Sequence, residues 1–132
     1  MRKSGYGSRK RTNLFAILLG LCLSMILHFV LSLPGALIMN AVKNPSAAVG
    51  IVGALTHLAC GIITAFAICR YKAEGALFCC LVYSLAFFLL ALGGGIFTDG
   101  KISLTAVINS AIYTAVSVLF AAVFKWAKRK RR

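Results

Sequence analysis

Four long stretches of the chain contain no Asp, Glu, Lys or Arg: residues 12–42, 44–69, 75–98 and 102–124. Each is long enough to cross a bilayer, because about 20 apolar residues in a helix span a hydrocarbon core about 30 Å thick. Charged residues make up 13% of the chain, whereas soluble domains carry roughly 25%. The pattern therefore predicts an all-α membrane protein. We expect its four transmembrane helices at about 14–41, 47–69, 74–95 and 102–124.

Positive charge is concentrated in two tails, at residues 1–13 and 125–132. The net charge of +13 would by itself also suit a protein that binds nucleic acid. Each basic tail adjoins an uncharged stretch, however, and short cytoplasmic segments of membrane proteins are enriched in Lys and Arg. We therefore expect no nucleic-acid partner, a disordered tail over 1–13, and contacts with anionic lipid headgroups. The basic residues predicted to make these contacts are Arg9, Lys10, Arg11, Arg70, Lys72, Lys128 and Arg129.

The basic residues also predict an orientation in the membrane. Four spans place both tails and the 70–74 connection on one side of the membrane. The only basic residues in the connections on the other side are Lys43 and Lys101. Because the connections rich in Lys and Arg are the cytoplasmic ones, both termini are expected to be cytoplasmic. The helices would then form two antiparallel hairpins, 14–69 and 74–124, in a multi-pass protein of a bacterial cytoplasmic membrane.

Three local features add detail to this prediction. Pro34-Gly35 predicts a tilt or a break in the first helix, because that helix is longer than the bilayer and proline removes a backbone donor. The glycines at 93–95 predict the end of the third helix. Glu74 is expected at the N-terminus of that helix, where a carboxylate favours the positive end of the helix dipole. Both the capping of a tight turn and contact with a partner stay open for Glu74.

Both histidines lie near the middle of a predicted span, His28 before the first outer connection and His57 after it. Each belongs to a row of small residues that recur every four positions, and such rows let helix backbones approach closely. Three roles stay open for the histidines: hydrogen bonding between helices, a proton-relay or permeation pathway, and a metal site. The rows predict helix–helix contacts through Gly20, Ser24, Ser32, Gly53, Gly61 and Ala65.

A further row of polar residues runs along the fourth helix, where Asn109, Tyr113 and Ser117 recur every four positions. Tyr83 of the third helix can reach the same depth as Tyr113. Such rows commonly make hydrogen bonds between helices, but they would also suit a polar interior. The candidate intramembrane polar site therefore comprises His28, His57, Tyr83, Asn109 and Tyr113.

The sequence contains no recognisable catalytic set. Its two acidic residues lie at opposite faces of the membrane, so a Ser-His-Asp or Cys-His-Asp set cannot form within it. It has no P-loop or dinucleotide-binding motif. Two histidines without a CxxC or HExxH pattern are too few ligands for a zinc site. We expect no enzymatic activity, no cofactor and no metal.

Residues 61–87, GIITAFAICRYKAEGALFCCLVYSLAF, combine a helical glycine, a basic turn, Gly75 at the start of the third helix and then Tyr83. In these features the chain resembles the YrzE-like group of small four-helix bacterial membrane proteins, over residues 50–92 and elsewhere by length and topology. Cys79 departs from the small residue, such as glycine, expected there. The resemblance implies a four-helix bacterial membrane protein and transfers no site residue.

Three functions suit these features. The rows of small residues favour a small integral membrane protein that acts through helix–helix contacts, as an assembly or stabilising partner or as a homo-oligomer. The alternative is a transporter or channel subunit with a polar midplane around His28 and His57, which would need a dimer to enclose a path. The small size and the basic C-terminal tail also suit a holin-like pore former.

Overall fold

The computed structural model of the chain describes residues 5–72 and 74–130, with the backbone alone for 5–12, 46–47, 95 and 98–99. This part of the chain forms helices and short connections and contains no strand. The helices are α1 (Gly5–Ala41), α2 (Pro45–Tyr71), α3 (Ala76–Asp99) and α4 (Leu104–Lys130). All four are long and apolar enough to cross a membrane, which confirms the predicted all-α class with four candidate spans.

The helices extend beyond the bounds that the sequence predicts. Residues 5–13, expected as a disordered tail, form the first turns of α1, and α4 continues through the basic tail to Lys130. Arg and Lys are good helix formers, so the hydrogen-bonded ladder of an apolar span continues into a basic tail. Basic side chains in the last turn of α4 also favour the negative end of its dipole.

The sequence predicts that the glycines at 93–95 end α3. The structure shows instead that they lie inside this helix. The helix continues to Asp99 and ends at Gly100, whose φ of 64° is left-handed and whose N–H bonds to the carbonyl of Ile96. Glycine adopts this conformation without a steric penalty, so it is the common residue after a helix end. At the other end α3 begins one residue after Gly75, so Glu74 precedes the helix.

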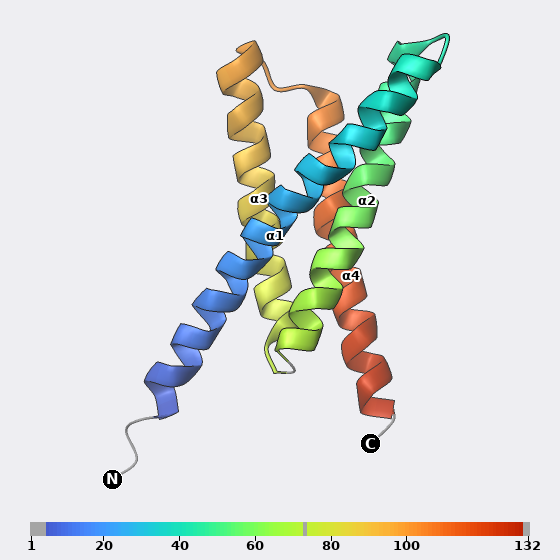
Figure 1. Cartoon of the computed structure of the whole chain (residues 1–132). Helices are drawn as coiled ribbons and strands as arrows, with labels where there is room; N and C mark the ends of the chain where they lie inside the picture. The colour runs from blue at the N-terminus through green and yellow to red at the C-terminus, as the bar shows by residue number, and fades with distance from the viewer. Residues whose placement is uncertain (1–4, 73, 131–132) are drawn as a thin grey trace.

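Proline 34 does not break α1, which is continuous over 37 residues, or about 56 Å at 1.5 Å per residue. Figure 1 shows α1 running obliquely, with its first half beside α3 and its second half beside α2. Helix α4 contacts both α2 and α3, whereas α2 and α3 contact each other only a little, so the order around the bundle is α1, α2, α4, α3. Consecutive helices run in opposite directions, and the start of α1, the end of α2, the start of α3 and the end of α4 lie at the same end of the bundle (Figure 1).

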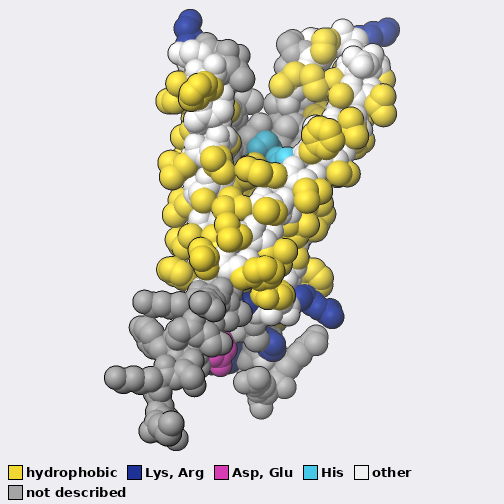
Figure 2. Space-filling model, turned by 60° about the vertical axis from the view of Figure 1, so that its left-hand side comes forward, with side chains coloured by type: hydrophobic (Ala, Val, Ile, Leu, Met, Phe, Trp, Pro, Cys, Tyr) yellow, Lys and Arg dark blue, Asp and Glu magenta, His cyan; other side chains and the backbone are white. Residues whose placement is uncertain are grey.

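The bundle has a packed half and a splayed half. We call residues 13–28, 53–71, 76–87 and 109–130 the closed half, which lies toward the chain ends, and residues 29–52 and 88–108 the open half. Apart from Gly35, every described residue that is buried lies in the closed half, within 16–24, 60–69, 79–87 and 109–121. In Figure 2 the open half divides into two arms, and histidine side chains are visible at the base of the opening between them.

Candidate functional site

The two histidines meet where the open half joins the closed half. His28 projects from α1 and His57 from α2, and their ring centroids lie 4.6 Å apart with the rings edge to face. Each ring is fixed to its own helix, because the Nδ1 atoms lie 2.8 Å from the carbonyl oxygens of Ser24 and Gly53. A carbonyl oxygen accepts, so Nδ1 donates in both rings. The Nε2 atoms are therefore the ones left to bind a proton or a polar ligand.

Aromatic rings enclose His28 on further sides. The ring of Phe87 on α3 stacks on it at 4.5 Å, and the ring of Tyr113 on α4 lies edge-on at 5.4 Å. The Nε2 atom of His28 is buried and has no hydrogen-bond partner among the described residues. An unpaired polar nitrogen at this depth is unfavourable unless a proton, water or ligand group meets it.

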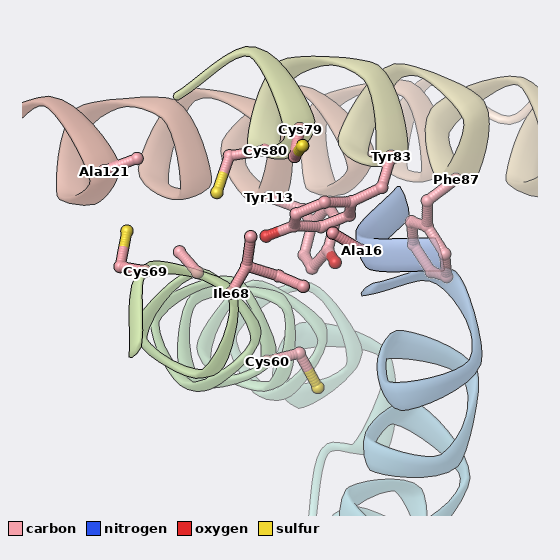
Figure 3. Close-up of a cluster of buried hydrophobic side chains, with 11 residues drawn as sticks. Ala16, Cys60, Ile68, Cys69, Cys79, Cys80, Tyr83, Phe87, Tyr113 and Ala121 are labelled. Atoms are coloured by element: carbon pink, nitrogen blue, oxygen red, sulfur yellow. The ribbon is translucent and has the colours of Figure 1, made fainter. Parts of the chain in front are cut away.

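Tyr113 links the histidine cluster to the polar core below it. Its hydroxyl forms a hydrogen bond with Ser24 Oγ. The Ser24 hydroxyl also donates to the carbonyl of Gly20, at 2.7 Å, so in this pair Tyr113 donates and Ser24 accepts. Figure 3 shows Tyr83, Tyr113 and Phe87 pointing into the space between the helices. The ring centroids of Tyr83 and Tyr113 are 6.5 Å apart.

The rows of small residues contact other helices of the same chain. A Cβ atom on Gly20 would lie 2.8 Å from the ring of Tyr83, and one on Gly53 would lie 2.7 Å from Nδ2 of Asn109. A Cβ on Gly61 would lie 3.2 Å from Ser117 Oγ, which donates to the carbonyl of Gly61. These contacts are inside the bundle, so the backbones at Gly20, Gly53 and Gly61 are not available to a partner.

The predicted polar site is thus brought together around one point. His28, His57 and Tyr113 are in ring contact, Tyr83 lies beside Tyr113, and Asn109 contacts the helix turn that holds His57. Ala65 and Ser24 are buried with them. Ser32 is different from the rest of its row: it is exposed and its hydroxyl bonds to the carbonyl of Phe29.

Sequence reasoning missed two kinds of residue in this site. Phe87, which stacks on His28, lies one turn after Tyr83 on the same face of α3, and this four-residue spacing could have indicated it. The buried hydroxyls of Ser84 and Ser110 between α3 and α4 were missed because serine also occurs commonly on exposed surfaces. Within the described chain no group of three or more His, Cys, Asp or Glu could hold a metal ion.

The residues predicted to contact lipid headgroups lie at the end of the closed half. The Arg70 guanidinium lies over the ring of Phe66, 5.8 Å from its centroid, and Lys72 caps the C-terminus of α2. Lys128 and Arg129 lie in the last turn of α4. The side chains of Arg9, Lys10 and Arg11 lie outside the described residues, although their backbone belongs to α1.

The fold and the site define a class: an all-helical chain with four candidate membrane spans and a histidine–tyrosine cluster between them. No protein-family model, curated protein or solved structure matches the chain.

Proposed function

We propose that this chain is a multi-pass integral protein of a bacterial cytoplasmic membrane that acts through helix–helix contacts, as an assembly or stabilising partner or as a homo-oligomer. Both termini and the 72–75 connection lie on the cytoplasmic side, and the chain forms two antiparallel hairpins. The charge distribution supports this orientation, because Lys43 and Lys101 are the only basic residues at the far end of the bundle among those described. The resemblance of residues 50–92 to the YrzE-like group supports the same class.

The observation that carries the proposal is the opening between the two arms of the open half. It leads to the His28–His57 pair (Figure 2). Imidazole nitrogens facing lipid chains would be poorly solvated, because ionisable groups within a bilayer normally face protein or water. Something other than lipid therefore fills the opening, and a helix from a second membrane protein or a second copy meets this requirement.

The surfaces of the open half suit such a helix. A Cβ atom on Gly93 of α3 or on Gly50 of α2 would meet no atom within 4 Å, so these glycines present backbone that another helix can approach closely. On α1 the side chains of Phe29, Leu33 and Leu37 are 70%, 59% and 70% exposed. The open half therefore combines small and large apolar groups, as helix-packing surfaces in membranes do.

Photo-crosslinking in living cells tests this proposal. A photoreactive phenylalanine analogue replaces Leu37 in the open half or, as the control, Val123 in the closed half, which is 61% exposed. We expect a crosslinked protein at position 37 and none at 123, and loss of the crosslink when Gly93→Leu fills the small surface. Equal products at both positions, or none at either, would contradict the proposal. Two differently tagged copies distinguish a homo-oligomer from another partner.

A second candidate function is a transporter or channel subunit, working as a dimer. The buried Nε2 of His28 favours it, because that atom has no hydrogen-bond partner among the described residues and lies in the cluster at the base of the opening. Water that fills the opening and enters the cluster would let this nitrogen bind and release protons. Flux of protons or monovalent cations into proteoliposomes should then vanish with His28→Ala or His57→Ala and persist with Ser32→Ala. Absence of all such flux in the unchanged protein counts against this function.

A further inference from the structure

A cavity of about 450 Å³ lies at the end of the closed half, between the last turns of α4, the end of α2 and the start of α3. Its inner wall is apolar, formed by Leu77, Ala121 and Phe124. Its charged residues are Lys125, Lys128 and Arg129 of α4 together with Glu74. The cavity is thus amphipathic, with a net positive rim over an apolar interior.

The three basic residues share one side of α4. Positions i, i+3 and i+4 of a helix are neighbours on its surface, so Lys125, Lys128 and Arg129 face the cavity together. Lys130 does not line it; its ammonium lies over the ring of Trp126, 4.7 Å from the centroid. Among the described basic residues of α4, Lys125, Lys128 and Arg129 therefore face the cavity and Lys130 does not.

The start of α3 forms the opposite wall. Gly75, Ala76 and Leu77 line the cavity, and Gly75 precedes the helix in a left-handed conformation with φ of 76°. The first N–H groups of a helix have no partner within it, and that end of the helix dipole is positive. These groups add to the attraction of the three cations for an anion.

We propose that this cavity binds the phosphate headgroup of an anionic phospholipid of the cytoplasmic leaflet, with its glycerol and first acyl carbons against Leu77, Ala121 and Phe124. Basic pockets between membrane helices on this side bind anionic headgroups, and an apolar wall beside the cations suits a lipid better than a soluble phosphate. Glu74, the only glutamate of the chain, then belongs to a lipid site rather than only to a turn. The inference rests on the proposed membrane insertion.

Native mass spectrometry of the full chain in neutral detergent tests the site, with phosphatidylglycerol compared against phosphatidylcholine of the same acyl chains. We expect phosphatidylglycerol to bind preferentially and Lys125→Gln/Lys128→Gln/Arg129→Gln to weaken it by about tenfold or more. The matched control, Lys130→Gln/Arg131→Gln/Arg132→Gln, removes the same charge and should retain binding. Equal loss in both variants would show diffuse attraction to the tail and overturn the proposal, as would equal binding of the two lipids.

Glycerol 3-phosphate added as a competitor distinguishes the lipid from a soluble phosphate. The lipid site predicts little displacement at millimolar competitor, whereas displacement as effective as that by phosphatidylglycerol would overturn the lipid assignment. Membrane fractionation of the same variants keeps the two proposals apart. A chain absent from the membrane fraction contradicts the insertion itself, and a membrane-integrated chain without lipid preference contradicts only the cavity.

Discussion

The closed and open halves of the bundle use their glycines in opposite ways. In the closed half a Cβ on Gly20 or Gly53 would come within 2.8 Å or 2.7 Å of a side chain from another helix. In the open half a Cβ on Gly50 or Gly93 would meet nothing within 4 Å. Gly35 is intermediate, since its Cβ would lie 3.0 Å from Val52 of the adjacent α2. Glycine therefore allows close helix packing in the closed half, whereas in the open half it leaves helix backbone that no other helix covers.

Hydrophobicity does not explain this difference, because all four helices remain apolar through both halves. What differs is the polar content of the interior: the buried serines 24, 84, 110 and 117 all lie in the closed half. Between membrane helices, lipid is as apolar as leucine, so association depends on close packing and on hydrogen bonds. The half that has these groups packs, and the half that lacks them splays.

The largest effect on stability is expected when glycine is replaced by alanine in each half. Gly20→Ala should destabilise the chain by about 1–3 kcal/mol, because the new methyl meets the Tyr83 ring near its Cβ, where the ring cannot swing away. Gly93→Ala meets nothing and should stabilise by up to about 1 kcal/mol, since alanine favours the helix. Thermal unfolding of each variant in the same detergent measures both effects. Destabilisation of similar size at both positions would contradict the distinction between the halves.

Much of the fold could be predicted from the sequence, because its strongest signal is physical and local. The uncharged stretches, such as 44–69, are each long enough to cross a bilayer as a helix, and their number alone indicates four helices. The bounds were less predictable. Gly93–Gly95 resemble a helix end in sequence, yet a membrane span tolerates glycine, and the end comes at Gly100. The continuation of the helices into the basic tails was not predicted either, although Arg and Lys are good helix formers.

The candidate site was predictable in part, for a similar reason. Four-residue spacing indicates which residues share a face, so His28, Ser24 and Gly20 could be grouped on one helix. Which faces meet depends on the order of helices around the bundle, and spacing carries no information on that order. The cavity beside Glu74 was unpredictable for the same reason, because it joins the starts and ends of three different helices.

A smaller loss of stability is expected when the hydrogen bond between Tyr113 and Ser24, beside the histidine cluster, is removed. Tyr113→Phe removes the donor to Ser24 and keeps the ring against His28, so we expect a loss of about 1 kcal/mol. Tyr71→Phe is the matched control, because Tyr71 is 51% exposed at the end of α2. Chemical unfolding in mixed micelles measures both variants. Unchanged stability of Tyr113→Phe would mean that packing alone closes this half.

The last prediction concerns the tautomer of the two histidines at the boundary between the halves, and it involves no change in stability. The Nδ1 atoms of His28 and His57 lie 2.8 Å from backbone carbonyls of their own helices, so the neutral rings should carry hydrogen on Nδ1. Nitrogen NMR of protein labelled at histidine distinguishes the two tautomers. Hydrogen on Nε2 would contradict this arrangement and would mean that the Nδ1–carbonyl bonds do not form. With hydrogen on Nδ1, each Nε2 is an acceptor. The Nε2 of His28 is buried in the cluster, so the Nε2 of His57 is the one expected to meet a donor from a partner helix or from water. Comparing spectra with and without the crosslinked partner separates these sources, because the Nε2 signal changes on adding the partner if the partner supplies the donor.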